Sequence, residues 1–297
     1  MAHRNLHGAE EYFLKEVYGP QLASSKKVEI SMFGKKLSMD YCAINYCSKY
    51  PDDIVILVTG FGSGWGGMVL LGYESMMLGH QVSMPSLPGY GNSDNPHHSY
   101  YDHEHNDFFC EAEALHQWIQ KAHPGKNIHL VGHSMSCPII VTYAHEHPGR
   151  VVSLSLLNPV GFSERSLCDL GVAFAINGIR HGIAFSGNPK WKILERFLLD
   201  EKNAFLSDFP DRFKLRWSEA NRLCCDCASS KLAWIIRHIP AKCFYAEHDS
   251  VANYIISGVQ YEELPLYHNT TRYRSDVTAK AISDFIRPYI ELEASPV

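Results

Sequence analysis

Ser134 lies in the stretch VGHSMS, between small residues and directly after the apolar run NIHL. A serine hydroxyl is a weak nucleophile at neutral pH. To attack a carbonyl it needs a base that takes its proton, an acid that orients the base, and hydrogen-bond donors for the oxyanion that forms. These groups do chemistry together only if the fold brings them to one place.

The candidate base and acid lie near the C-terminus, each after a strand-like run. ELPLYHNT supplies His268 as the base, and CFYAEHDS supplies Asp249 as the acid, with Glu247 as an alternative acid. Asn158, which ends an earlier strand-like run, is an amide and cannot serve as a carboxylate. In open α/β sheets, ligand sites lie beyond the carboxyl ends of the strands. We therefore expect Ser134, Asp249 and His268 to meet at this edge.

Two backbone N–H groups are the expected oxyanion donors. Ser134 stands between a strand-like run and a helix-like one, so the N–H of Met135 is expected to point out of a helix N-terminus. The second donor is expected from LVTGFGSGW, which follows an earlier strand. We expect this donor to be the Phe61 N–H, with Gly60 and Gly62 allowing a close backbone approach.

The order of strand-like and helix-like segments predicts an α/β fold. Residues 26–44 read as two strands joined at Phe33-Gly34, and strands then alternate with helices from about residue 54 to 160. This alternation predicts parallel βαβ units. Residues 161–236 contain helix-like pieces such as PKWKILERFLLDEKNAFL and no clear strand, after which the α/β pattern resumes.

Together these segments predict a mostly parallel central sheet with flanking helices and an inserted helical segment. The expected boundaries are 1–160 for the first part of the core, 161–236 for the insertion, and 237–297 for the second part of the core.

Several motifs resemble those of a capped α/β-hydrolase, over roughly residues 54–160 and 237–290. VGHSMS resembles the nucleophile elbow, TGFGSG the oxyanion loop, SLPGYGNSD the Pro-Gly loop and YAEHDS the acid turn. The order serine, acid, histidine is also that of this family. The resemblance implies the α/β-hydrolase fold, a helical cap at 161–236, and a reaction that needs no metal or organic cofactor.

Four departures from the family pattern stand out. Ser136 replaces the last glycine of the elbow, Thr59 replaces the usual histidine of the oxyanion loop, and Ser86 replaces the usual aspartate of the Pro-Gly loop. In addition, Asp249 and His268 are only 19 positions apart, where the family normally has a helix and a longer loop. The short interval bears directly on which residue is the acid.

A serine at the elbow implies acyl transfer, so the resemblance predicts a serine hydrolase that forms an acyl-enzyme. The expected substrate is a carboxylic ester, either a monoacyl lipid or a small alkyl or aryl ester. The apolar content of residues 161–236 favours an apolar acyl pocket. Two alternatives stay open: a carbon–carbon bond hydrolase with the same triad, and a non-catalytic small-molecule receptor or scaffold.

Composition sets the remaining expectations. The net charge is −5, and the sequence has no block of like charges, which argues against a nucleic-acid partner. The N-terminus has no apolar stretch of signal-peptide length, and GVAFAINGIRHGIAF is too interrupted by polar residues to form an integral membrane segment. The nine cysteines then suggest free thiols, and we expect a cytoplasmic protein of undetermined oligomeric state.

Two further stretches contain residue types that bind metals. Residues 97–107, HHSYYDHEHND, are interpreted as the start of a surface helix, where exposed pairs one turn apart, such as His103 and Asp107, are common. Residues 224–227, CCDC, are interpreted as buried cysteines because they lack a second Cys/His pair at zinc-finger spacing. Beside the elbow, His133 and Cys137 are interpreted as packing residues.

Overall fold

The computed structural model describes residues 23–44, 48–96, 108–185, 217–252, 254–266, 268, 270–272 and 274–293. Within these residues, eight strands form one sheet in the order β1-β2-β4-β3-β5-β6-β7-β8. Their bounds are β1 Ala23–Met32, β2 Lys35–Ile44, β3 Asp53–Val58, β4 Val82–Pro85, β5 Asn127–His133, β6 Val151–Leu157, β7 Ala241–Ala246 and β8 Gln260–Leu264.

The sheet is mostly parallel, as predicted. β1 and β2 form an antiparallel hairpin whose turn is Phe33-Gly34, both with positive φ, and β2 also runs antiparallel to β4. Every other neighbouring pair is parallel. β3 is buried along its whole length, which explains its continuous apolar sequence.

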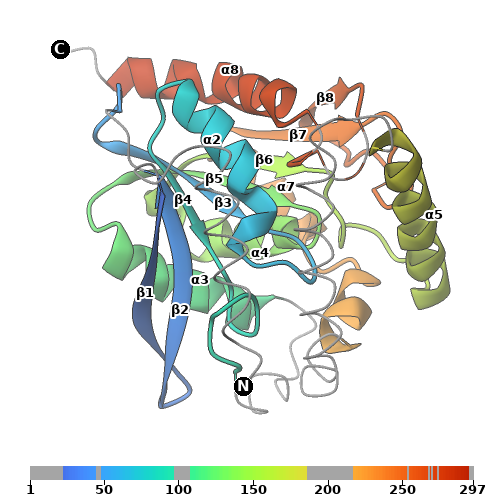
Figure 1. Ribbon diagram of the computed structural model, residues 1–297, viewed down its shortest axis with the longest axis horizontal. Coiled ribbons are helices and arrows are strands. Elements are labelled where there is room, and N and C mark those ends of the chain that lie inside the picture. Colours follow the sequence, from blue (N-terminus) through green and yellow to red (C-terminus); the bar gives the residue numbers. More distant parts are fainter. Residues whose placement is uncertain are drawn as a thin grey trace.

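Helices cover both faces of the sheet (Figure 1). α2 (Val69–Met77) and α8 (Ser275–Glu293) pack on one face, and α3 (Phe109–Ala122) and α4 (Ser136–Glu146) pack on the other. None of the described helices is both long enough and apolar enough to cross a membrane.

Helix α2 is absent from the sequence-based prediction. Its sequence, VLLGYESMM, follows a glycine-rich loop and carries Gly72 in its interior, which weakens the helical signal. The structure gives a packing reason for this glycine, because a Cβ atom there would lie 2.8 Å from the Sδ atom of Met84 on β4.

The described part of residues 161–236 contains helices joined by turns and irregular segments, and no strand. It comprises α5 (Leu167–Phe185), helical residues 217–223 and α7 (Ser229–Ile235), which packs on α4. The stretch PKWKILERFLLDEKNAFL lies outside the described residues. α5 lies at the edge of the molecule, near the loops that follow β7 and β8 (Figure 1).

The connection between β7 and β8 explains the short interval noted in the sequence. Residues 247–259 join these two parallel neighbours, and the described ones form turns and bends rather than a helix. Asp249 and His268 therefore follow the carboxyl ends of adjacent strands. A separation of 19 residues is enough to bring them together.

Candidate active site

Ser134 occupies a tight turn between β5 and α4. Its φ of 56° lies in the left-handed region, which is costly for a residue with a side chain and which recurs at functional sites. Its backbone N–H donates to the Leu157 carbonyl on β6, at 2.9 Å. Gly132 lies two residues before Ser134, and a Cβ atom at this glycine would lie 2.8 Å from the Ile140 side chain. The backbone itself thus holds the serine in place.

Ser136, the departure from the elbow pattern, fits this turn through its hydroxyl group. The buried Oγ accepts the backbone N–H of His133 at 2.7 Å and donates to the Val58 carbonyl at 2.6 Å. It therefore ties the elbow to the end of the central strand β3, a contact that glycine could not make.

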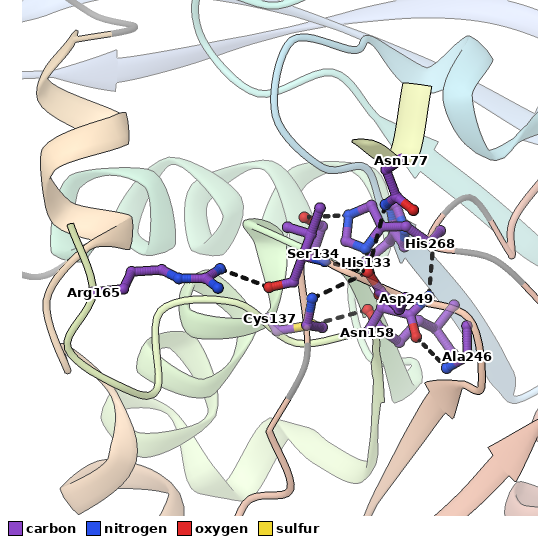
Figure 2. Close-up of polar contacts among 12 residues, drawn as sticks. His133, Ser134, Cys137, Asn158, Arg165, Asn177, Ala246, Asp249 and His268 are labelled. Carbon is purple, nitrogen blue, oxygen red and sulfur yellow. Dashed lines mark hydrogen bonds and ion pairs between the residues drawn. The ribbon is translucent and has the colours of Figure 1, made fainter. Parts of the chain in front are cut away.

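The side chains of Ser134, His268 and Asp249 form one hydrogen-bonded chain (Figure 2). His268 Nε2 lies 3.0 Å from Ser134 Oγ, and His268 Nδ1 lies 2.6 Å from Asp249 Oδ2. Because a carboxylate only accepts, Nδ1–H donates to Asp249, which leaves Nε2 free to accept the serine proton. The arrangement can thus transfer a proton from Ser134 to His268.

The environment of Asp249 keeps its carboxyl group ionised. Burial alone raises the pKa of Asp249, but the charge and hydrogen bond of His268 and the N–H groups of Ala252 and Val251 hold this pKa below its ordinary value. The Asp249 side chain is 1% exposed, whereas Glu247 is exposed. Of the two candidate acids, the structure brings Asp249 to the histidine.

Two side chains hold the backbone of His268. The His268 carbonyl accepts Asn158 Nδ2–H at 2.8 Å and His133 Nε2–H at 2.7 Å. Asn158 Oδ1 in turn accepts the N–H of Ala246 at the end of β7, at 2.7 Å. Burial lowers the pKa of His133 to about 3, so this ring stays neutral.

These contacts add two candidate site residues that the sequence analysis does not predict. The sequence indicates only that Asn158 cannot supply the carboxylate and that His133 is a packing residue. A polar residue at the carboxyl end of a buried strand is the signal that pointed to Asn158.

The predicted oxyanion loop lies against Ser134. A Cβ atom at Gly60 would lie 3.0 Å from the His133 carbonyl oxygen and 3.2 Å from Ser134 Cβ, so a larger residue at position 60 would require these neighbours to shift. Ser86, the departure in the Pro-Gly loop, accepts the backbone N–H of Trp65 at 2.9 Å and anchors the far end of this loop. Phe61 and Met135, the expected donors, directly follow Gly60 and Ser134 on these two touching segments.

Aromatic rings from two segments lie beside the histidine. Phe174 on α5 packs edge-on to His268 with ring centroids 6.1 Å apart, and its ring lies 6.4 Å from that of Phe61. Helix α5 thus contributes apolar surface beside His268.

Cys137, three residues after Ser134, is less suited to nucleophilic attack than the serine. Burial raises the pKa of the Cys137 thiol well above its ordinary value, which keeps it protonated. Cys224, Cys225 and Cys227 are free thiols, and residues 97–107 lie outside the described residues. Among the described residues, no three His, Cys, Asp or Glu side chains gather where they could hold a metal ion.

Comparison with known proteins identifies the same fold. The family described as alpha/beta hydrolase fold matches residues 53–176. A relative named 1-acylglycerol-3-phosphate O-acyltransferase ABHD5, from Mus musculus, is 29% identical over 219 residues, which cover 70% of this chain and 60% of the relative. Lipase 3 of Moraxella sp. (strain TA144) is 30% identical over 108 residues, which cover 36% of this chain and 32% of the lipase.

A solved structure extends this likeness over nearly the whole chain. The putative lipase lip1 from Acinetobacter baumannii superposes with a TM-score of 0.68 at 15% identity, covering 97% of each chain. At that identity the likeness concerns the fold. The strand order, the family match over residues 53–176 and this superposition agree, and the chain therefore has the α/β-hydrolase fold.

Proposed function

We propose that the protein is a serine hydrolase that cleaves a carboxylic ester through an acyl-enzyme. The observation that carries this proposal is the unbroken hydrogen-bonded chain from Ser134 Oγ through His268 to Asp249, at 3.0 Å and 2.6 Å. A non-catalytic receptor has no chemical need for a buried nucleophile, base and acid in this order.

In the first half of the proposed reaction, Ser134 Oγ bonds to the carbonyl carbon while His268 Nε2 takes its proton. His268 then gives this proton to the leaving alcohol as the ester C–O bond breaks. The N–H groups of Phe61 and Met135 hold the tetrahedral oxyanion, an interaction worth about 3–4 kcal/mol per donor in well-studied hydrolases. Asp249 fixes the histidine tautomer and stabilises the imidazolium.

In the second half, water attacks the acyl-enzyme. His268 takes a proton from this water and returns it to Ser134 Oγ as the acyl–serine bond breaks. The products are a carboxylic acid and the regenerated serine, so no redox partner is required.

The proposed substrate is a monoacyl lipid or a small alkyl or aryl ester. The rings of Phe61 and Phe174 beside His268 support an apolar substrate. Two relatives are also named as a lipase and as an acyltransferase for an acylglycerol phosphate, and both names refer to acyl esters. In this proposal, residues 161–236 form a cap between two core parts, 1–160 and 237–297, and α5 lines the site.

The test is the intact mass of the protein after incubation with a fluorophosphonate probe. We expect stoichiometric labelling of the wild type, none of Ser134→Ala, and sharply slower labelling of His268→Ala. Ser230→Ala, which changes an exposed serine on α7, is the matched control and should label like the wild type.

A folded wild type that takes no label would instead favour the non-catalytic reading. If labelling is found, a panel of p-nitrophenyl esters of increasing acyl length measures the chain-length preference.

A further inference from the structure

One buried polar side chain interrupts the apolar inner face of helix α5. Leu170, Ala173 and Asn177 are the buried residues of its described side chains, at the spacing of one helical face, and Asn177 is only 3% exposed. On the outer face, Val172 and Ile176 are exposed. The inner face is therefore packed against the core, and its polar member is the residue that needs an explanation.

Asn177 reaches the acid of the proposed triad (Figure 2). Its Nδ2 lies 3.5 Å from Asp249 Oδ1, a long hydrogen bond to the oxygen that also accepts the N–H groups of Val251 and Ala252. The amide oxygen of Asn177 is buried and has no hydrogen-bond partner among the described residues.

Because the Asn177 amide group is only partly hydrogen-bonded, packing alone does not account for an asparagine at this position. Burying an amide group without a full set of hydrogen bonds costs desolvation free energy that is not recovered. A leucine, which has the same branching and the same number of side-chain heavy atoms, would avoid that cost and would match the neighbouring Leu170 and Ala173. What leucine would lack is the N–H group that faces Asp249.

We propose that Asn177 is a positioning residue that couples helix α5 to the Asp249–His268 pair. Its role in catalysis rests on the proposed function, but its electrostatic effect on the pair does not. The positive end of the amide dipole faces the Asp249 carboxylate and partly offsets its negative charge. The negative charge that Asp249 presents to the His268 imidazolium is thereby reduced.

The position of α5 determines two contacts with the Asp249–His268 pair. Phe174, one turn before Asn177, places its ring edge-on to His268. A displacement of α5 away from the core would therefore remove the Phe174 ring from His268 and the Asn177 amide from Asp249 at the same time.

Other charged and titratable groups near the pair are unchanged by a substitution at position 177. Besides Asp249 and His268 themselves, these are the neutral ring of His133, Arg272, which follows His268, and Arg165, which donates to the Val251 carbonyl in the acid loop. A shift in the His268 titration upon substitution would accordingly report the loss of the amide.

The experiment compares the wild type with Asn177→Leu by NMR, following the imidazole signals of histidine-labelled protein against pH, with His268→Ala used to assign His268. We expect the His268 pKa to rise by about 0.5 unit, less than the loss of an ideal hydrogen bond to a charged group would give. We also expect an unchanged or higher Tm. The acid limb of kcat/KM should move in the same direction.

Two more variants make the result decisive. Ile176→Ala changes the adjacent, outward-facing residue and should leave the His268 titration unchanged. Asn177→Ala removes the amide without adding apolar bulk and should raise the His268 pKa as Asn177→Leu does. An unchanged titration in both Asn177 variants would overturn the coupling and leave Asn177 as a packing residue.

The two proposals can fail separately. If the wild type takes no fluorophosphonate label, the proposed hydrolase function fails, whereas the NMR titration still tests the coupling between Asn177 and the pair.

Discussion

The proposed nucleophile and the proposed acid–base pair are held in place by different means. Ser134 is held by its own backbone, through a left-handed turn between a strand and a helix and an N–H donated to the next strand. His268 and Asp249 lie on loops, and side chains from elsewhere hold them, with His133 lying 135 residues and Asn158 lying 110 residues from His268 in the sequence. Local geometry places one half of the site, and long-range side-chain contacts place the other.

The largest expected effect comes from changing the acid. Asp249→Asn keeps the shape of the side chain but no longer favours the histidine tautomer that can accept the serine proton. We expect kcat to fall about 10⁴-fold, as the equivalent change does in a serine-protease triad. The measurement is the hydrolysis rate of the best ester in the panel.

Glu247→Gln is the control for this experiment and should hydrolyse the same ester at the wild-type rate. A comparable loss in Glu247→Gln would instead make Glu247 the acid.

A smaller effect is expected from the residue that holds the histidine backbone. Asn158→Leu removes one of the two donors to the His268 carbonyl and the acceptor for Ala246 N–H. A displacement of about 1 Å in a catalytic group costs on the order of 10²-fold in rate, so we expect labelling by the probe to slow roughly 10- to 100-fold.

Asn221→Ala is the matched control, because this asparagine is exposed and its Nδ2–H donates to the Trp217 carbonyl one helical turn away. If Asn158→Leu labels at the wild-type rate, His133 alone suffices to place the histidine.

The smallest effect on the reaction is expected at the elbow itself. Ser136→Ala leaves the His133 N–H and the Val58 carbonyl without this partner, so the free energy of unfolding should fall by about 1–3 kcal/mol. Labelling of Ser134 should stay within a few-fold of wild type, because its N–H still bonds to Leu157.

Urea unfolding measures this change, with Ser230→Ala as the control on an exposed serine. If Ser136→Ala keeps full stability but loses labelling, Ser134 depends on a side chain for its position and is not held by its backbone alone.

The same contrast explains what the sequence could predict. The strands, the parallel alternation and the elbow each depend on residues close together in the chain, and the structure agrees with all three. Helix α2 is not predicted because Gly72, which packs closely on Met84, weakens the helical pattern of its sequence. The reason for this glycine lies on the neighbouring strand β4 and cannot be read from the sequence around it.

The acid–base side shows the opposite case. Asp249 and His268 were predicted from their places after strands, but the residues that hold them were not. Asn158 and His133 act through contacts with a backbone carbonyl more than 100 residues away, and Asn177 was noted only as an interruption of an apolar segment. Their amide and imidazole groups have no local pattern that assigns them a partner.

The direct connection between β7 and β8 has a consequence for the order in which the site forms. Closing the chain between Asp249 and His268 spans 19 residues, whereas joining His268 to Ser134 spans 134. Since the entropy lost on closing a loop grows with the logarithm of its length, the longer closure costs about 1.7 kcal/mol more. We expect the β7–β8 segment to bring acid and base together first during folding, and docking of this segment on the elbow to complete the triad.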